Sequence, residues 1–307
     1  MSRTIINYKN TKWTNLNLLY DIKKLASLFA GEVPVRFSRI GNSNINRLFR
    51  VDFKHKSVIL KISPNWYNTS LYREKWCYER IKKLVNVPKV LFYLNSNNKL
   101  LPSHEILALE FINGRQLTKR NFLDNSINEG VASIFRAVHS LDTKKYGFLD
   151  ANMQGKHTTW TDFLLDIENI DTPLCSKHVA KSDLKWLLDS MSSIETNGHH
   201  CLLYGDFKED NFISKDNSIF AIDFQNCLSG IDLYDISIGV FNIRFLLKHL
   251  RTYVNVVSPN ITHEVLLYSM RHAVTVILNS AASGDVKTLN FSKKRLKELK
   301  RAYSKIT

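Results

Sequence analysis

Three polar residues in the second half of this 307-residue chain have the types and the spacing that phosphoryl transfer needs. Asp206 and Asn211 lie five residues apart, and Asp223 follows 12 residues after Asn211. A carboxylate can orient an attacking hydroxyl and accept its proton. Two further oxygen donors can hold Mg²⁺ across the phosphates of a nucleotide, because Mg²⁺ prefers oxygen ligands and keeps positions for phosphate and water. We therefore expect Asp206 to be catalytic and Asn211 and Asp223 to bind the metal.

The residues around this set predict a strand-loop-strand element over Cys201–Asp223. An apolar strand precedes Gly205-Asp206, a turn lies at Lys215–Ser218, and a second apolar strand ends at Asp223. A single Asp after Gly often only caps a turn. The ordered combination is rarer, and its D-x-x-x-x-N spacing is that of a kinase catalytic loop.

A lysine and a glutamate upstream complete the predicted chemistry. Lys61 lies in an apolar strand, Ser57–Ile62, where a half-buried ammonium needs an anion. Glu74, 13 residues later in a predicted helix over Ser70–Val85, can supply the carboxylate while nucleotide phosphates supply the rest. Glu79 is the alternative partner.

One turn in the first part of the chain is a weaker candidate for phosphate binding. The turn Gly41-Asn42-Ser43-Asn44 lies between two predicted strands, and its backbone N–H groups could fold over phosphate. It holds only one glycine. We expect Ser43 and Asn44 to contact the nucleotide there.

The remaining elements predict an α+β fold with two lobes, a nucleotide-binding lobe at residues 1–109 and a helical catalytic and acceptor-binding lobe at 110–307. Short β-branched and aromatic runs predict an antiparallel sheet in the first lobe, interrupted by the one helix. The runs are Val35–Ile40, Leu48–Phe53, Ser57–Ile62, Val90–Leu94 and Ile106–Phe111. Helical spacing predicts helices at Ile127–Leu141, Trp160–Ile167, Asp183–Ile194, Leu233–Leu250 and His263–Ala282.

Charge and composition exclude several other classes of protein. The formal net charge is +15, but residues 1–109 carry 19 Lys/Arg against 6 Asp/Glu, whereas residues 110–292 carry 17 against 21. The basic residues are scattered among asparagines and no nucleic-acid motif occurs, so we expect no nucleic-acid partner. No apolar run approaches the roughly 20 residues of a membrane span, and residues Met1–Asn10 lack the apolar stretch and the small-residue cleavage site of a signal peptide. We expect a cytoplasmic protein whose four cysteines are reduced and buried: Cys77, Cys175, Cys201 and Cys227.

Over most of its length the sequence resembles the aminoglycoside phosphotransferase and choline kinase superfamily, kinase-like enzymes that phosphorylate hydroxyls of small molecules. The motifs that carry the resemblance run through both predicted lobes. They are Ile40-Gly41-Asn42-Ser43-Asn44, Val58-Ile59-Leu60-Lys61, Tyr72-Arg73-Glu74, Val87-Pro88-Lys89-Val90-Leu91, the hinge Leu107–Gly114, Val138-His139-Ser140-Leu141, Tyr204-Gly205-Asp206 to Asn211, Ile222-Asp223-Phe224 and Tyr234-Asp235-Ile236.

The resemblance implies a protein-kinase-like fold with an ATP or GTP site between the lobes and the base bonded to hinge backbone near Leu109 and Phe111. It also implies that Asp235 braces the catalytic loop, and we interpret His139 as a packing residue. Two departures from the family pattern are Tyr204, where the family usually has His, and the single glycine Gly41.

These observations predict an ATP- or GTP-dependent O-phosphotransferase that uses Mg²⁺. A protein substrate is disfavoured because Phe224-Gln225 follows Asp223, so no D-F-G begins there, and no A-P-E segment occurs. A nucleotide-binding pseudokinase is the non-enzymatic alternative. The motifs do not identify the acceptor. We rank an amine-bearing antibiotic such as an aminoglycoside first, choline or another amino alcohol second, and a sugar third. A cationic acceptor is favoured by acidic residues of the second lobe, at Asp162, Asp166, Glu168 and Asp171.

Overall fold

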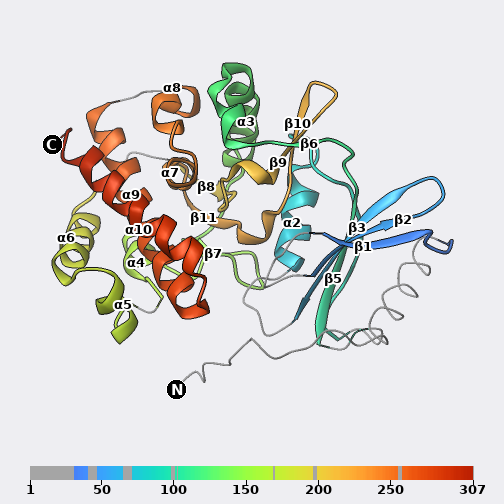
Figure 1. The fold of residues 1–307 in the computed structure, drawn as a ribbon, viewed down its shortest axis with the longest axis horizontal. Helices are drawn as coiled ribbons and strands as arrows, with labels where there is room; N and C mark the ends of the chain where they lie inside the picture. The colour runs from blue at the N-terminus through green and yellow to red at the C-terminus, as the bar shows by residue number, and fades with distance from the viewer. Residues whose placement is uncertain are drawn as a thin grey trace. The chain divides into compact units, whose positions relative to one another are not determined.

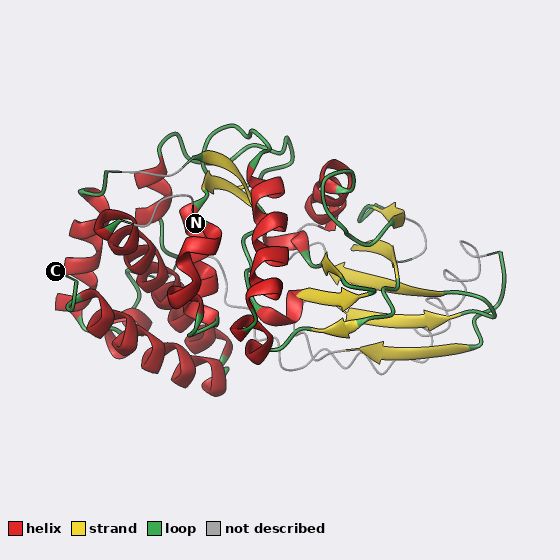
Figure 2. Ribbon diagram, turned by 90° about the horizontal axis from the view of Figure 1, so that it is seen from above, coloured by secondary structure: helices red, strands yellow, loops and turns green. Residues whose placement is uncertain are grey.

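The five apolar runs of the first lobe form one antiparallel sheet in the computed structural model, which describes residues 31–40, 47–64, 71–97, 101, 103–168, 170–195, 199–254 and 258–306. The strands lie in the order β1-β2-β3-β5-β4. Figure 2 draws the strands of this sheet side by side in yellow. Their bounds are β1 Arg36–Ile40, β2 Arg47–Asp52, β3 Ser57–Pro64, β4 Val90–Leu94 and β5 His104–Glu110. All neighbouring pairs are antiparallel, so the predicted sheet is confirmed.

The sheet has a core on one face because apolar residues alternate along its strands. Val51, Leu60 and Ile106 are almost fully buried. They belong to one hydrophobic cluster that is built mainly from β2, β3 and β5. The residues 41–46 between β1 and β2 include Ser43 and Asn44, which therefore lie outside the described part of the chain.

The described residues divide into two units. The first holds those within Met1–Tyr72 and Lys89–Phe111, and the second holds those within Arg73–Pro88 and Ile112–Thr307. Each unit has its own core, and the second contains the predicted catalytic residues.

Helix α2, Leu71–Ile81, is the helix predicted between the strands, and from Arg73 onward it belongs to the second unit. It buries Leu71, Cys77 and Ile81 at helical spacing. The helix ends before the predicted Val85, and turn residues follow at 82–84 before the extended residues that precede β4.

Two small sheets in the second unit hold the predicted strand-loop-strand element. β8, His200–Leu203, lies in a sheet of order β7-β11-β8, with β7 at Gly147–Phe148 and β11 at Leu228–Ile231. β9, Phe212–Lys215, and β10, Ser218–Ala221, pair as a hairpin, and β6, Arg115–Gln116, is added to its edge. Sequence reasoning missed β6, β7 and β11, which are only two to four residues long and obtain their pairing from distant segments.

The second unit is otherwise helical, as predicted (Figure 1). Its helices are α3 Asn125–His139, α4 Trp160–Leu165, α5 Pro173–His178, α6 Lys181–Ser192, α7 Leu233–Asn242, α8 Leu250–Tyr253, α9 Pro259–Ser283 and α10 Val286–Tyr303. Helices α9 and α10 run side by side.

One helix prediction needs correction, and sequence reasoning missed three helices, α5, α8 and α10. The predicted helix over Leu233–Leu250 is wrong in its second half, because α7 ends at Asn242 and Ile243 is extended, with φ −118° and ψ 97°.

Helix α10 is rich in lysine and arginine, yet it buries Leu299 and Arg295. The Arg295 guanidinium donates to the carbonyl oxygens of Val240 at 2.6 Å and Phe241 at 3.0 Å, so a basic helix can still pack when its buried charge is hydrogen-bonded.

The cysteines match the prediction that they are buried, because all four have almost no exposed surface. Two of them are neighbours: Sγ of Cys77 lies 2.7 Å from Sγ of Cys227. Among the described residues, no helix combines the length and the apolar character that crossing a bilayer requires.

A buried arginine joins α9 to the end of α4. Arg271 donates to the carbonyl oxygens of Phe163 at 2.7 Å and Leu164 at 3.0 Å, and to the Tyr234 hydroxyl at 2.7 Å. These carbonyls lie near the end of a helix, where no intrahelical donor reaches them. The guanidinium therefore satisfies polar groups that folding would otherwise leave buried without a partner.

We predict that Arg271→Met destabilises the protein by about 2–4 kcal/mol, because it leaves several buried acceptors without donors. Denaturant unfolding measures the loss. Arg301→Met, at an exposed position of α10, is the control and is expected to change stability by less than about 0.5 kcal/mol. Equal losses in the two variants would contradict this role of Arg271.

Candidate active site

The loop that carries Asp206 begins with a backbone turn that only glycine accommodates. Gly205 follows β8 and has φ +80°, and a Cβ at this position would collide with the carbonyl oxygen of Asn226. The left-handed conformation and the close approach both favour a residue without a side chain. Gly205 thus lets the chain turn between the end of β8 and Asp206.

A buried carboxylate holds this turn. Asp235, near the start of α7, accepts hydrogen bonds from the backbone N–H groups of Tyr204 and Gly205, each at 2.7 Å. Its Oδ2 also lies 2.9 Å from Nε2 of His139. Asp235 therefore braces the loop, and the interpretation of His139 as a packing residue is incomplete, because its ring also bonds to this carboxylate.

Asp206 and Asn211 lie together, as their spacing predicted. The Asn211 side-chain amide donates to the backbone oxygen of Asp206 at 2.9 Å and to its carboxylate Oδ2 at 3.0 Å. The 3₁₀ turn Glu209–Asn211 brings the two residues together. The amide oxygen of Asn211 carries the lone pairs that can bind a cation, and no hydrogen bond within this pair of residues uses it.

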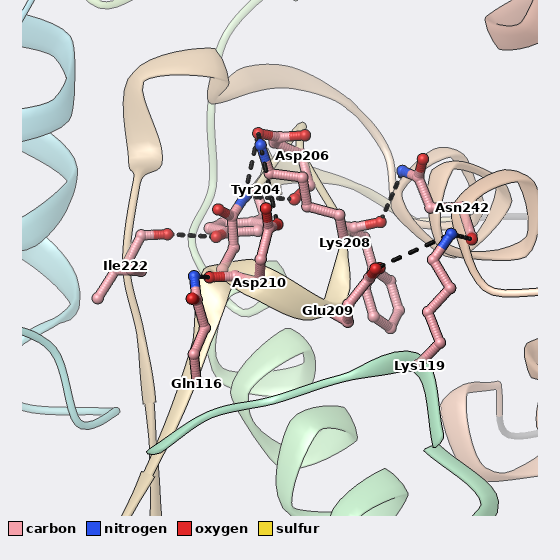
Figure 3. Close-up of polar contacts among 11 residues, drawn as sticks. Gln116, Lys119, Tyr204, Asp206, Lys208, Glu209, Asp210, Ile222 and Asn242 are labelled. Carbon is pink, nitrogen blue, oxygen red and sulfur yellow. Dashed lines mark hydrogen bonds and ion pairs between the residues drawn. The ribbon is translucent and has the colours of Figure 1, made fainter. Parts of the chain in front are cut away.

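Lys208 is a part of this site that sequence reasoning missed. Its Nζ lies 3.2 Å from Oδ2 of Asp206 (Figure 3). Burial raises the pKa of the Asp206 carboxyl, while the Lys208 charge opposes that effect and the Asp223 charge adds to it. Burial alone would lower the pKa of Lys208, but the carboxylates of Asp206, Asp210 and Asp223 raise it above its ordinary value. The sequence could have indicated this contact, since Lys208 follows Asp206 by only two residues in the same loop.

Side chains from other elements hold the loop backbone at several points (Figure 3). Gln116 donates from Nε2 to the carbonyl oxygen of Asp210, and Asn242 donates to that of Phe207 at 3.0 Å. Lys119 donates to the carbonyl of Asn242 at 2.9 Å. Nothing in the sequence near Asp206 pointed to these contacts, because their partners come from about 30 to 120 residues away.

Asp223 follows β10 in an uncommon backbone conformation. Its φ is 66° and its ψ is 62°, the left-handed region that non-glycine residues seldom adopt. Its N–H donates to the hydroxyl of Tyr78 at 2.9 Å, and the same hydroxyl donates to Oε1 of Glu74 at 3.0 Å. Sequence reasoning missed Tyr78, although its position four residues after Glu74 places both on one face of α2.

Glu74 and its alternative Glu79 have different surroundings. Glu74 is fully buried, whereas Glu79 is exposed and pairs with Lys75 at 3.0 Å on the surface of α2. Because Glu79 is engaged in a surface ion pair, the structure favours Glu74 over Glu79 as the predicted carboxylate partner of Lys61.

The other predicted site residues belong to the first unit. Lys61 is buried in β3, which lies between β2 and β5. Leu109 is buried in β5, opposite Ile59. The backbone N–H of Phe111 donates to the Ser57 carbonyl at 3.4 Å. Contacts of these residues with a nucleotide stay predictions.

The donor set around Asp223 suits a magnesium ion. Within the described residues, no three His, Cys, Asp or Glu side chains gather into a metal cage. The carboxylate of Asp223 and the amide oxygen of Asn211 are the hard donors that Mg²⁺ takes when phosphates and water complete its coordination. The negative charge of Asp223 raises the pKa of Asp206, so a cation bound here would relieve repulsion between the two carboxylates.

Comparison with known protein families identifies the class of protein. The model of the phosphotransferase enzyme family matches residues 36–253, and the chain belongs to this family. The family match makes it a phosphotransferase. No curated protein matches the sequence.

Solved structures share the fold at low sequence identity. A thermostable mutant of aminoglycoside phosphotransferase APH(4)-Ia, in a ternary complex with AMP-PNP and hygromycin B, is 16% identical with a TM-score of 0.74, covering 92% of this chain and 98% of that one. Amicoumacin kinase hAmiN with AMP-PNP, Ca²⁺ and Ami is 15% identical with a TM-score of 0.64, covering 95% and 94%. Choline kinase LicA from Streptococcus pneumoniae is 14% identical with a TM-score of 0.64, covering 92% and 99%. The kinase-like fold expected from the sequence is confirmed.

We predict that Gly205→Ala lowers activity strongly and destabilises the protein, because a methyl group would collide with the Asn226 carbonyl and displace Asp206. Gly284→Ala is a matched control: Gly284 also has a positive φ, +73°, but nothing lies within 4 Å of its Cβ position. The control should cost only the roughly 1 kcal/mol of a left-handed alanine. Thermal unfolding and turnover of both variants test the difference, and equal effects would show that the collision is unimportant.

Proposed function

We propose that this chain transfers the γ-phosphoryl group of ATP or GTP to a hydroxyl of a small amine-bearing molecule, with Asp206 as the catalytic carboxylate. The observation that carries the proposal is the arrangement of Asp206 within 3.0 Å of Asn211 and 3.2 Å of Lys208 on a loop braced by Asp235. A carboxylate held in this way can orient the acceptor hydroxyl and take its proton.

Asn211 and Asp223 would hold Mg²⁺, which supplies charge neutralisation for the transferred phosphoryl group when it is bound. Lys208 places an ammonium beside the catalytic carboxylate, where it can offset negative charge on the phosphoryl oxygens. Most of the catalytic effect would then come from positioning and electrostatic stabilisation.

The first unit would supply the nucleotide contacts. Lys61 would bind the α- and β-phosphates and pair with Glu74. Ser43 and Asn44 would also contact the phosphates. The backbone near Leu109 and Phe111 would bond to the base. The burial of Lys61 supports the assignment to phosphate, because phosphate is an anion that a buried ammonium can bind.

An amine-bearing antibiotic, such as an aminoglycoside, is the acceptor we propose. Asp166, Glu168 and Asp171 are exposed at the end of α4 and beyond it, and can attract a cation. Asp162 is a weaker candidate, because its carboxylate accepts from the Thr159 N–H at 3.2 Å and caps α4. The similar structures include one with hygromycin B, one with Ami and a choline kinase, so the choice of acceptor rests on these exposed carboxylates.

We predict that Asp206→Asn lowers kcat by roughly 10²- to 10⁴-fold while nucleotide affinity survives, because the carboxylate serves the acceptor hydroxyl. The acceptor is first found by measuring ADP or GDP release against aminoglycosides, peptide antibiotics, amino alcohols and sugars. Asp210→Asn, at an exposed position of the same loop, is the control and should keep most of the activity. A near-normal kcat of Asp206→Asn with the acceptor found would remove Asp206 from this role.

We also predict that the double variant Asp166→Asn with Glu168→Gln raises the KM of a cationic acceptor by about 2- to 5-fold at low salt, and less at high salt. The KM of the nucleotide should not change. Asp216→Asn, an exposed aspartate in the β9–β10 turn, is the control for lost negative charge. No effect at any salt would favour a neutral sugar as the acceptor.

A further inference from the structure

Two tyrosine hydroxyls hold the two ends of a single peptide group next to the metal site. The peptide joins Ile222 to Asp223. Its N–H donates to the hydroxyl of Tyr78 at 2.9 Å, and its carbonyl oxygen accepts from the hydroxyl of Tyr204 (Figure 3 shows the second bond). The tyrosines come from α2 and from the turn after β8, so the peptide is held from two directions.

The two tyrosines are themselves fixed by packing. Both are about 1% exposed. The ring of Phe224 contacts the Tyr78 ring at 5.4 Å and the Tyr204 ring at 4.6 Å between centroids, edge to face in both cases. Neither hydroxyl can leave the peptide without disturbing this buried aromatic cluster.

The hydrogen bonds bear on the conformation of Asp223. Its left-handed backbone costs roughly 1–2 kcal/mol for a residue with a side chain. Rotating the Ile222–Asp223 peptide changes φ of Asp223 and could relieve that cost. The rotation would also break both bonds to tyrosine and leave a partly buried N–H and carbonyl without these partners.

We propose that Tyr78 and Tyr204 are positioning residues for the metal site: by holding the Ile222–Asp223 peptide, they fix the direction in which the Asp223 carboxylate leaves the backbone. This inference rests on the proposed function, in which Asp223 binds the metal. The Tyr204 hydroxyl is the cleaner probe, because the Tyr78 hydroxyl also donates to Glu74.

The test is Mn²⁺ binding to the full-length protein in the presence of AMP-PNP, followed by electron paramagnetic resonance. Tyr204→Phe and Tyr78→Phe are expected to raise the Mn²⁺ dissociation constant on the order of tenfold, as losing a group that supports a ligand usually does. In turnover assays, Tyr204→Phe should raise the Mg²⁺ concentration for half-maximal rate more than it lowers kcat at saturating Mg²⁺.

Tyr268→Phe is the matched control. The Tyr268 hydroxyl is equally buried, accepts from Trp160 Nε1 at 2.8 Å, and donates at 2.7 Å to Glu264, four residues earlier on the same helix. Its loss should lower the melting temperature while Mn²⁺ affinity stays unchanged. An equal loss of Mn²⁺ affinity in Tyr268→Phe and Tyr204→Phe would overturn the proposal, because general destabilisation would then explain both.

Asp223→Asn distinguishes a failure of the tyrosine positioning role from a failure of the proposed metal site. If it weakens Mn²⁺ binding while both tyrosine variants bind like the unmodified protein, the positioning role is wrong and the proposed metal site stands. If Asp223→Asn binds Mn²⁺ normally, the proposed metal site is wrong and the positioning role falls with it.

Discussion

The buried carboxylate of Asp235 is the interaction on which the candidate site depends. It satisfies two consecutive backbone N–H groups at Tyr204 and Gly205, in a turn whose geometry gives those groups no partner in a strand or helix. A charged acceptor makes such bonds stronger than a neutral one does. Because Asp206 is the next residue, its position follows from this anchoring of the turn.

The same physical principle recurs at Asp223, with neutral groups in place of a carboxylate. Burial raises the pKa of Tyr78 and Tyr204 well above the ordinary value, so both hydroxyls remain protonated and able to donate. The backbone polar groups on both sides of the site are thus paired with side chains from distant segments. The loop and Asp223 are held by hydrogen bonds to buried side chains rather than by regular secondary structure.

Much of the fold could be predicted from the sequence, because periodicity is a local property. The strands over residues 48–53, 57–62 and 90–94 and the helix after residue 70 follow from alternation and helical spacing. The break after Asn242 and the basic helix α10 do not, because hydrophobic periodicity does not reveal a turn set by tertiary contacts or a helix anchored by a buried arginine that bonds to distant carbonyls.

The sequence by itself determined the family, the fold class and the pairing of Asp206 with Asn211, since five residues of loop leave little freedom in how those side chains meet. Only the tertiary structure decided which groups hold them. Tyr78 reaches Asp223 across 145 residues of chain and His139 reaches Asp235 across 96. Spacing along the chain carries no information about such contacts, because they exist only once the packed core has brought the segments together.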